Sequence, residues 1–395
     1  IKFYFLLSIF LCILFPSNLN WSAITSKINT TDIIIGDNKV YAATEGGIVI
    51  VDILSNNISE VSFDDGLYPL DLSSISEGCG DYILLGSSSP KGVLQRIDLK
   101  NNYIDKVDHL DWVISINEIV CIDNFIFVVG NTQTSSGIIE YENSENGIAY
   151  IDYYDNLPLD YNMINDLDIL NEKLVVSTDN GIIMGDYNYS LHLHSNWEIL
   201  NEGQNIIEFE HQFLLDGDSN MVDMYYDVNS MTNNIINDDY YYEMQSNDTT
   251  FSFNIPIQTR FSSIYRKNNI VAIGLENHGL CIINRYDGSV NIYIPNSIHS
   301  NIVHAIDEYN DGIVGVGNNG FFIFNDQKIS NYISMNKQDE FPYTMSNFSN
   351  RFVSYVPGFK STWSVVSDNS SNNIIFSNSG IPPYSSDDAY GGIVN

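Results

Sequence analysis

The sequence contains few positively charged residues. Only 16 of its 395 residues are Lys or Arg, against 50 Asp or Glu, which gives a formal net charge of −34 at pH 7. A surface of this charge repels phosphate backbones and anionic lipids, so nucleic acid is not expected as a partner. The chain is nevertheless not of the disordered type, because 44% of its residues are hydrophobic and only 17% are charged.

Cysteine is also scarce. Besides Cys12, the chain has only Cys79, Cys121 and Cys281. This odd number in a long chain does not predict a disulfide scaffold. Cys121 and Cys281 lie in apolar runs, so we expect them to be small buried side chains. No cysteine motif indicates zinc, and no cofactor is expected.

Long apolar runs are missing after the first residues. Residues 3–15 are apolar-rich and follow Lys2. This run is shorter than the roughly 20 residues of a spanning helix and fits a secretory signal. We therefore expect residues 1–22 to be a signal peptide, cleaved near Ser22–Ala23, and the protein to be exported to the periplasm or outer cell surface. A buried N-terminal strand or helix is the alternative, and no later segment predicts a membrane span.

Helical periodicity is missing past residue 20, and a short β motif repeats instead. The stretches Lys39–Ile50 and Lys173–Met184 carry Lys, Thr, Gly and Ile at the same offsets, 134 residues apart. Turn glycines recur with spacings of 45, 45, 44, 98 and 41 residues, at Gly47, Gly92, Gly137, Gly181, Gly279 and Gly320. The gap of 98 residues predicts one more degenerate unit, near residues 212–220.

The repeat predicts an all-β chain. In the unit around Gly181 we expect strands over residues 163–169, 173–178, 182–187 and 197–200. The strands are near-continuous apolar runs, which is typical of sheets covered on both faces. A period of ~40–50 residues is that of a four-stranded propeller blade, so the sequence favours a single seven-bladed β-propeller over residues 23–384. Residues 385–395 are expected to begin a further module, and tandem β-sandwiches are the alternative fold.

A second repeat lies between these units. The stretches Asp65–Leu70 and Asp155–Leu159 begin 90 residues apart, which is two periods, and Pro295–Ile298 has a related place. Their Pro and Gly are typical of exposed turns. We expect them to connect the outer strand of one blade to the inner strand of the next.

These motifs resemble a known family. The Asp-Gly-Leu-type connector, apolar strand and Thr-x-x-Gly-Ile/Leu turn are similar to the two-component-regulator propeller repeat, over about residues 30–384. With the signal peptide, they look most like the N-terminal propeller of PorZ-like surface proteins of the type IX secretion system. The family's usual Trp in the second strand is replaced by Tyr41, Ile83, Phe127, Val175, Val271 and Val314. The resemblance implies a cell-surface role in which the propeller holds a partner protein or a surface glycan.

Candidate metal sites are weak in the sequence. His192 and His194 would lie on one face of a strand, but no third ligand is identifiable, and an exposed polar face is the alternative. The stretch Asp216–Asn220, with Asp227, mimics a calcium loop. Met221 replaces the glycine which that loop needs, so an Asn/Asp-rich hairpin turn is the alternative. Carboxylates are abundant, but no acid pair stands out as catalytic.

Tyrosines gather in one acidic segment between residues 221 and 250. They are Tyr225, Tyr226, Tyr240, Tyr241 and Tyr242. Tyr beside Asp and Asn offers apolar ring faces with hydrogen-bonding rims, as in surfaces that bind sugars or peptides. We take these tyrosines as candidate ligand-binding residues, with ordinary core or edge positions in a strand as the alternative.

The functional hypothesis is an exported, non-catalytic binding or scaffold module. The partner would be a protein or a surface glycan. One alternative is the periplasmic sensor propeller of a two-component signalling protein. Another is a glycan-processing enzyme.

Overall fold

The computed structural model describes residues 23–394 with internal gaps. These gaps are residue 37, 99–102, 107–109, 145–146, 171, 201–212, 216–220, 224–230, 237–238, 247–248, 256–258, 260, 310–311, 318–319, 326–327, 334–345, 349–350, 354–361, 369–372 and 379–389. The predicted signal peptide, residues 1–22, lies outside the described residues. Among the described residues, no helix is long and apolar enough to cross a membrane.

The described chain is built from antiparallel sheets, six of which have four strands in sequence order. The only helical elements in this part of the chain are two 3-10 turns, η1 (Phe63–Asp65) and η2 (His194–Asn196). The first four sheets are β1 (Thr30–Ile35), β2 (Lys39–Thr44), β3 (Gly47–Asp52), β4 (Asn57–Val61); β5 (Asp71–Glu77), β6 (Tyr82–Ser89), β7 (Leu94–Asp98), β8 (Tyr103–Lys106); β9 (Ser115–Ile122), β10 (Phe125–Asn131), β11 (Ser136–Ser144), β12 (Gly147–Tyr154); and β13 (Ile164–Leu170), β14 (Lys173–Thr178), β15 (Gly181–Gly185), β16 (Trp197–Leu200).

The remaining strands form two smaller sheets, two four-stranded sheets and one of five strands. They are β17 (Phe213–Leu215), β18 (Met221–Asp223); β19 (Met231–Ile236), β20 (Asp239–Ser246), β21 (Thr249–Ile255); β22 (Phe261–Lys267), β23 (Ile270–Leu275), β24 (Gly279–Asn284), β25 (Ser289–Tyr293); β26 (Val303–Tyr309), β27 (Gly312–Gly317), β28 (Gly320–Asn325), β29 (Lys328–Ile333); and β30 (Ser346–Phe348), β31 (Arg351–Val353), β32 (Thr362–Asp368), β33 (Asn373–Asn378), β34 (Tyr390–Val394).

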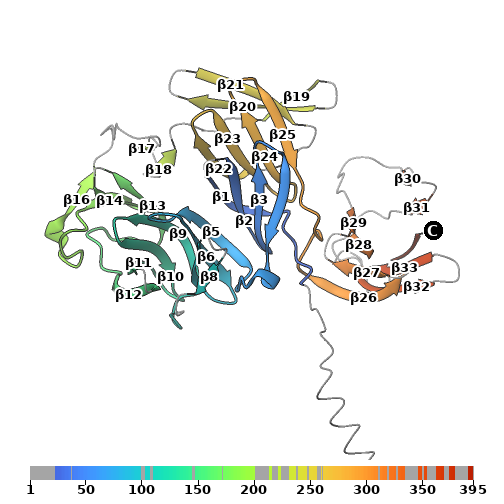
Figure 1. Cartoon of the computed structure of the whole chain (residues 1–395), viewed down its shortest axis with the longest axis horizontal. Helices are drawn as coiled ribbons and strands as arrows, with labels where there is room; N and C mark the ends of the chain where they lie inside the picture. Colours follow the sequence, from blue (N-terminus) through green and yellow to red (C-terminus); the bar gives the residue numbers. More distant parts are fainter. Residues whose placement is uncertain are drawn as a thin grey trace, which may run out of the picture.

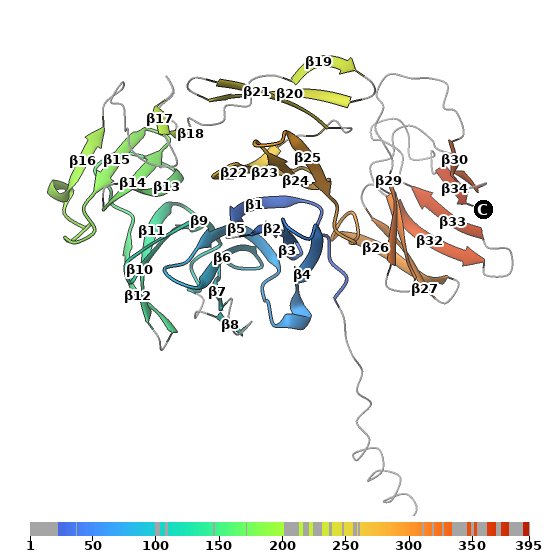
Figure 2. The ribbon, with the colours of Figure 1, turned by 45° about the horizontal axis from the view of Figure 1, so that its top comes forward.

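The sheets stand side by side like propeller blades, with the first strand of each sheet innermost. The inner strands β22, β1, β5, β9 and β13 pack against one another in that order (Figures 1 and 2). The outer strand β4 is mostly exposed, whereas the second strand β2 is almost entirely buried. This all-β arrangement of four-stranded sheets is the propeller architecture that the sequence predicts. Seven as the number of blades stays a prediction.

The hydrophobic core lies between neighbouring sheets rather than in one central mass. One cluster joins the first and second sheets through Ile34, Ile48, Leu72 and Leu85, and similar clusters fill the next two seams. The second-strand positions where the family has Trp are all buried, at Tyr41, Ile83, Phe127, Val175, Val271 and Val314. Strands covered on both faces explain the near-continuous apolar runs of the sequence.

The sheet β22–β25 packs against the first sheet. Their shared cluster includes Ile33, Val49 and Leu280. Thr30 Oγ1 donates a hydrogen bond to the Gly279 carbonyl at 3.0 Å, and the Gly279 N–H donates to the Ile28 carbonyl at 2.7 Å. This contact, here called the closing seam, joins residues 249 positions apart in the chain.

The chain preceding β1 is part of the closing seam. Ser26, Lys27 and Ile28 are almost fully buried. The Ser26 N–H donates to Asn301 Oδ1 at 2.6 Å, and the Lys27 N–H donates to Ser297 Oγ at 3.0 Å. The N-terminal residues thus lie against the connector that follows β25.

The strands after this connector are grouped separately. The sheets β26–β29 and β30–β34 neighbour each other, with β26 packed along β32, at the end of the molecule farthest from β13–β16 (Figures 1 and 2). That a single propeller covers residues 23–384 stays a prediction.

The sequence prediction of a single unit between Gly181 and Gly279 is wrong. The described residues of that gap form two sheets, β17–β18 and β19–β21. The repeat pattern does not predict the second sheet, because this part of the sequence has few apolar repeats and no turn glycine at the repeat spacing. The turn glycines themselves do occupy equivalent places, since each lies within two residues of the start of the third strand of its sheet.

The predicted strands of the fourth sheet are confirmed with small shifts. The second and fourth strands match residues 173–178 and 197–200, while β15 ends at Gly185 instead of residue 187. Glu172 adopts a φ of 58° in the first tight turn, and Gly181 adopts a φ of 143° at the start of β15. The predicted connectors also hold, because Asp65–Leu70, Asp155–Leu159 and Pro295–Ile298 all lie between an outer strand and the next inner strand.

Replacing Gly181 by Val is predicted to destabilise the fold. A β-branched side chain is disfavoured at this φ, and its Cβ would lie 3.3 Å from Leu159 Cδ1. We expect a loss of about 1–3 kcal/mol in unfolding free energy, measured by chemical denaturation. Glu198→Val, at an exposed mid-strand position of β16, is the matched control and should leave stability nearly unchanged. Equal stability of both variants would show that the turn accepts a side chain.

Candidate functional site

Carboxylates meet between the inner strands. Asp32 on β1 joins three sheets, because it accepts hydrogen bonds from the Ile75 N–H of β5 at 2.8 Å and from Ser263 Oγ of β22 at 3.2 Å. Its own neighbour, the Ile33 N–H, donates to the same carboxyl at 2.8 Å. Burial raises the pKa of Asp32 to about 6, against the opposing effect of these hydrogen bonds.

Three further carboxylates lie near Asp32. Glu118 comes from β9, and Asp166 and Asp168 come from β13. The pKa of Glu118 is raised well above its usual value, first by burial and then by the negative charges of Asp166, Asp32 and Asp168. We call these four residues the hub carboxylates. Among the described residues, no group of three or more His, Cys, Asp or Glu is arranged to hold a metal ion.

Because of the hub carboxylates, the free energy of unfolding is predicted to fall as pH rises. A carboxyl whose pKa is raised on folding favours the folded state below its unfolded value of 3.8, and this advantage is lost as pH rises through about 6. For Asp32 the difference amounts to about 3 kcal/mol at most. We expect the unfolding free energy to decrease between about pH 4 and pH 7.

Glu118→Gln tests the same charge cluster. The variant removes one negative charge from the hub while keeping a side chain of similar size. We expect it to be more stable than the parent at neutral pH and to show a flatter pH dependence in denaturant titrations. Exposed Glu142→Gln is the control, and an unaltered pH dependence in Glu118→Gln would contradict the shared-charge explanation.

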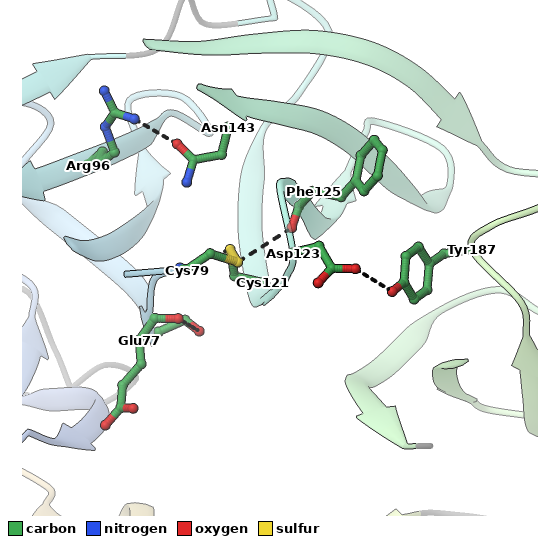
Figure 3. The surroundings of a disulfide bond; sticks show 9 residues. Glu77, Cys79, Arg96, Cys121, Asp123, Phe125, Asn143 and Tyr187 are labelled. Carbon is green, nitrogen blue, oxygen red and sulfur yellow. Dashed lines mark hydrogen bonds between the residues drawn. A yellow bond between two sulfur atoms is a disulfide. The ribbon is translucent and has the colours of Figure 1, made fainter. Parts of the chain in front are cut away.

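A disulfide joins the second and third sheets. Cys79, in the turn after β5, is bonded to Cys121 on β9, with 5.5 Å between their Cα atoms (Figure 3). The prediction that Cys121 is a free buried side chain is therefore wrong. Cys281 is buried and unpaired as predicted, and burial raises its pKa to about 12.

Cysteine counting missed this pair, but the repeat contains a signal for it. The two cysteines are 42 residues apart, close to one period of the repeat. Positions one period apart come to the same height in adjacent blades. Both cysteines lie at the end of an inner strand, where neighbouring blades are close together.

Other contacts join blades at the same end of the molecule, which we call the hairpin end. Asp123 accepts a hydrogen bond from the Tyr187 hydroxyl at 2.9 Å, and Arg96 donates to Asn143 Oδ1 at 2.6 Å (Figure 3). Lys267 Nζ and Glu77 Oε1 form an ion pair of 2.6 Å between β22 and β5. Most of these polar groups therefore have structural partners.

Removing the disulfide is predicted to lower stability substantially. Chain-entropy arguments for a loop of this length give about 4 kcal/mol at most. We expect Cys79→Ala/Cys121→Ala to melt at a lower temperature than the parent, with Cys281→Ala as the control for loss of a buried thiol. Mass spectrometry after alkylation without reductant should find one reactive thiol after unfolding of residues 23–395. Three such thiols would contradict the disulfide.

The opposite end carries the connectors, and we call it the connector end. Tyr68 N–H donates to Gln95 Oε1 at 2.9 Å, which fastens the first connector to β7. Trp112, in the second connector, packs on Tyr153 with ring centroids 4.6 Å apart. The Tyr161 hydroxyl, in the third connector, donates to the Ser136 carbonyl at 3.1 Å.

The two predicted metal-site histidines do not lie on a strand. His192 is in the loop before η2, and His194 begins η2. His192 Nε2 is 2.9 Å from Asp152 Oδ2, whereas His194 Nε2 is 3.0 Å from the Asn156 carbonyl oxygen. Each imidazole thus has a partner of its own on or after β12.

The His192 side chain belongs to a polar cluster between the third and fourth sheets. Its ring packs on Tyr154 at 4.7 Å between centroids, and the Tyr154 hydroxyl donates a hydrogen bond to Glu140. Burial raises the pKa of Glu140, and the hydrogen bond from Tyr154 opposes this effect. The cluster connects sheets, and no sequence pattern indicates it because its members are up to 52 residues apart.

The predicted ligand-binding tyrosines are not brought to a site that can be described. Tyr225 and Tyr226 lie outside the described residues, as does the candidate calcium loop Asp216–Asn220. Tyr240, Tyr241 and Tyr242 lie on β20, paired with β19 and β21. Their role in binding stays a prediction.

Comparison with known proteins confirms the fold. No protein-family model matches the sequence, and no curated protein matches it. The structure of PorZ, an essential bacterial surface component of the type-IX secretion system of human oral-microbiomic Porphyromonas gingivalis, matches with a TM-score of 0.52 and 14% identity. The match covers 91% of this chain and 57% of the PorZ chain.

Extracellular domains of Bacteroides thetaiotaomicron proteins are also similar. That of a putative one component system, BT4673, covers 88% of this chain and 52% of its own, with 13% identity and a TM-score of 0.35. That of a putative hybrid two component system, BT3049, covers 92% and 50%, with 13% identity and a TM-score of 0.33. The chain thus spans about half of each of these structures. The resemblance seen in the repeat motifs is confirmed for the fold, which is of the β-propeller type.

Proposed function

We propose that the chain is an exported, non-catalytic β-propeller that binds a protein or a surface glycan. In this role it serves as a scaffold in cell-surface protein secretion or in surface-glycan attachment. The disulfide between Cys79 and Cys121 is the observation that carries the proposal. Disulfides form and persist in oxidising compartments outside the cytoplasm. The apolar N-terminal run and the fold shared with PorZ, which is a surface component, support the same compartment.

The bonding of the described carboxylates supports a binding role over catalysis. Asp32, Asp52 and Asp179 accept hydrogen bonds from backbone N–H groups of their own turns or of neighbouring strands. Such bonds fix the backbone and occupy the oxygens that a catalytic acid or base would use. Among the hub carboxylates, Asp32 likewise bonds to strands of two neighbouring sheets.

We also infer that the first propeller ends near Ile298 rather than at residue 384. The closing seam brings β22–β25 to the first sheet, and the connector after β25 lies on the N-terminal residues. The described residues form seven sheets before this point, from β1 to β25. The sheets β26–β29 and β30–β34, which neighbour each other, then belong to a second unit.

The location can be tested with the full chain in a Gram-negative host. We expect fractionation to place the protein in the envelope, with Cys79 and Cys121 protected from alkylation until reductant is added. Cytoplasmic protein with both thiols free would contradict the proposal. Binding without turnover in a screen of surface polysaccharides and envelope proteins completes the test, and catalytic turnover of any glycan would favour the enzyme alternative.

A further inference from the structure

Apolar side chains gather on three successive connectors at the connector end. Phe63 and Tyr68 belong to the first connector, Trp112 and Ile114 to the second, and Met163 to the third. Each of these sheets is antiparallel and begins with its inner strand. The connectors that run from the outer strand of one sheet to the inner strand of the next therefore all lie at the same end of the strands. Topology therefore places these five residues, here called the connector patch, on one end of the molecule.

Hydrogen bonds and ring contacts tie the connectors to one another. Phe63 and Tyr68 contact edge to face, with 6.5 Å between ring centroids. The first connector is held on β7 by two bonds of Gln95, and the turn just before β7 meets the second connector through the Gly92 N–H and the Val113 carbonyl, 3.3 Å apart. Trp112 then packs on Tyr153, which precedes the third connector. These contacts join the three connectors that carry the patch.

The members of the patch are large apolar residues with exposed side chains. Their relative exposures are 51% for Phe63, 49% for Tyr68, 40% for Trp112, 44% for Ile114 and 50% for Met163. Single exposed apolar residues are ordinary on protein surfaces, but a connected group of them marks an interaction site.

Negative charge surrounds the patch. Asp64, Asp111, Asp155 and Asp160 are exposed on the same three connectors. Among the described residues of these connectors and of the turn before β7, the cation is Lys91, which already forms a 2.8 Å ion pair with Asp111. A partner that covers the connector patch must therefore bring positive charge of its own.

This charge decides between possible occupants. A second copy would bring another acidic patch of a chain with a net charge of −34, and an anionic lipid surface would also be repelled. A basic polypeptide is attracted, and its lysines or arginines can stack on Trp112 and pair with the surrounding carboxylates.

We propose that the connector patch docks a basic, apolar-bearing segment of a partner protein, in which Lys or Arg alternates with aliphatic or aromatic residues. The inference rests on the proposed function as a binding module and names the face and the partner chemistry. Partner aliphatic side chains cover Phe63, Tyr68 and Ile114, while the basic side chains lie over Asp64, Asp111 and Asp160.

The test is a binding titration of the purified full chain with a synthetic peptide of alternating Lys and Leu. Phe63→Ser/Ile114→Ser removes two exposed apolar side chains from the patch. Leu54→Ser/Tyr286→Ser is the matched control at the hairpin end, since these side chains are 77% and 87% exposed. Circular dichroism and melting temperature check that both variants are folded.

We expect the patch variant to bind at least about tenfold more weakly than the parent, and the control variant to bind equally well. Raising the salt concentration from about 0.05 M to about 0.5 M should weaken parent binding at least about tenfold, because the attraction is screened. Asp64→Asn should reduce this salt dependence, with exposed Glu198→Asn as the charge control.

Three outcomes would overturn the inference. They are absence of peptide binding, binding that both double variants weaken equally, and self-association that the patch variant abolishes. The titration uses purified protein and does not depend on where the protein resides, so these results leave the proposed export untouched. Failure of export in the fractionation experiment would in turn leave the patch result standing.

Discussion

The structure depends on the packing of apolar side chains between neighbouring sheets. A single four-stranded sheet of this chain has no core of its own, because both faces of strands such as β2 and β14 are buried by other sheets. The clusters that join one sheet to the next therefore supply most of the hydrophobic stabilisation. Apolar packing brings neighbouring sheets together. The hydrogen bond between Asp32 and Ile75 and the Cys79–Cys121 disulfide then hold them at fixed distances.

The sequence predicted the parts of this arrangement that repeat. Apolar runs and turn glycines gave the strands around Gly181 within two residues, because each strand is defined by local pattern and turn chemistry. The two small sheets between β16 and β22 were predicted as one, since their strands lack the repeated turn. Pairings between blades could not be predicted, because the contact of Asp32 with Ser263 depends on which sheets become neighbours. The disulfide is an intermediate case, because its cysteines lie 42 residues apart, close to one repeat period, while an odd number of cysteines does not indicate which of them pair.

The two ends of the blades differ in what their side chains do. At the hairpin end, Asp123, Glu77 and Arg96 are engaged in contacts between sheets. At the connector end, the backbone bonds of the connectors are satisfied while large side chains such as Phe63 and Met163 remain uncovered. Loops held on a rigid scaffold are where binding residues concentrate. Exposed apolar side chains such as Leu54 and Tyr286 also occur at the hairpin end, but at the connector end they lie among acidic connectors.

The position of the first described residues determines the order in which the chain can fold. Ser26 bonds to Asn301, Lys27 to Ser297 and Ile28 to Gly279. A ribosome or a translocation pore delivers these three partners long after the first sheet. Until then the first described residues have their contacts with the first sheet, such as Thr25 Oγ1 with the Gly46 carbonyl at 2.8 Å and Lys27 Nζ with Glu60 Oε2 at 2.8 Å. The apolar face of the first sheet that packs against β22–β25 is meanwhile uncovered. Contacts so distant in sequence are slow to form and leave intermediates prone to aggregation. The face of the first sheet that carries Ile33 and Val49 is therefore covered only once synthesis has passed β25.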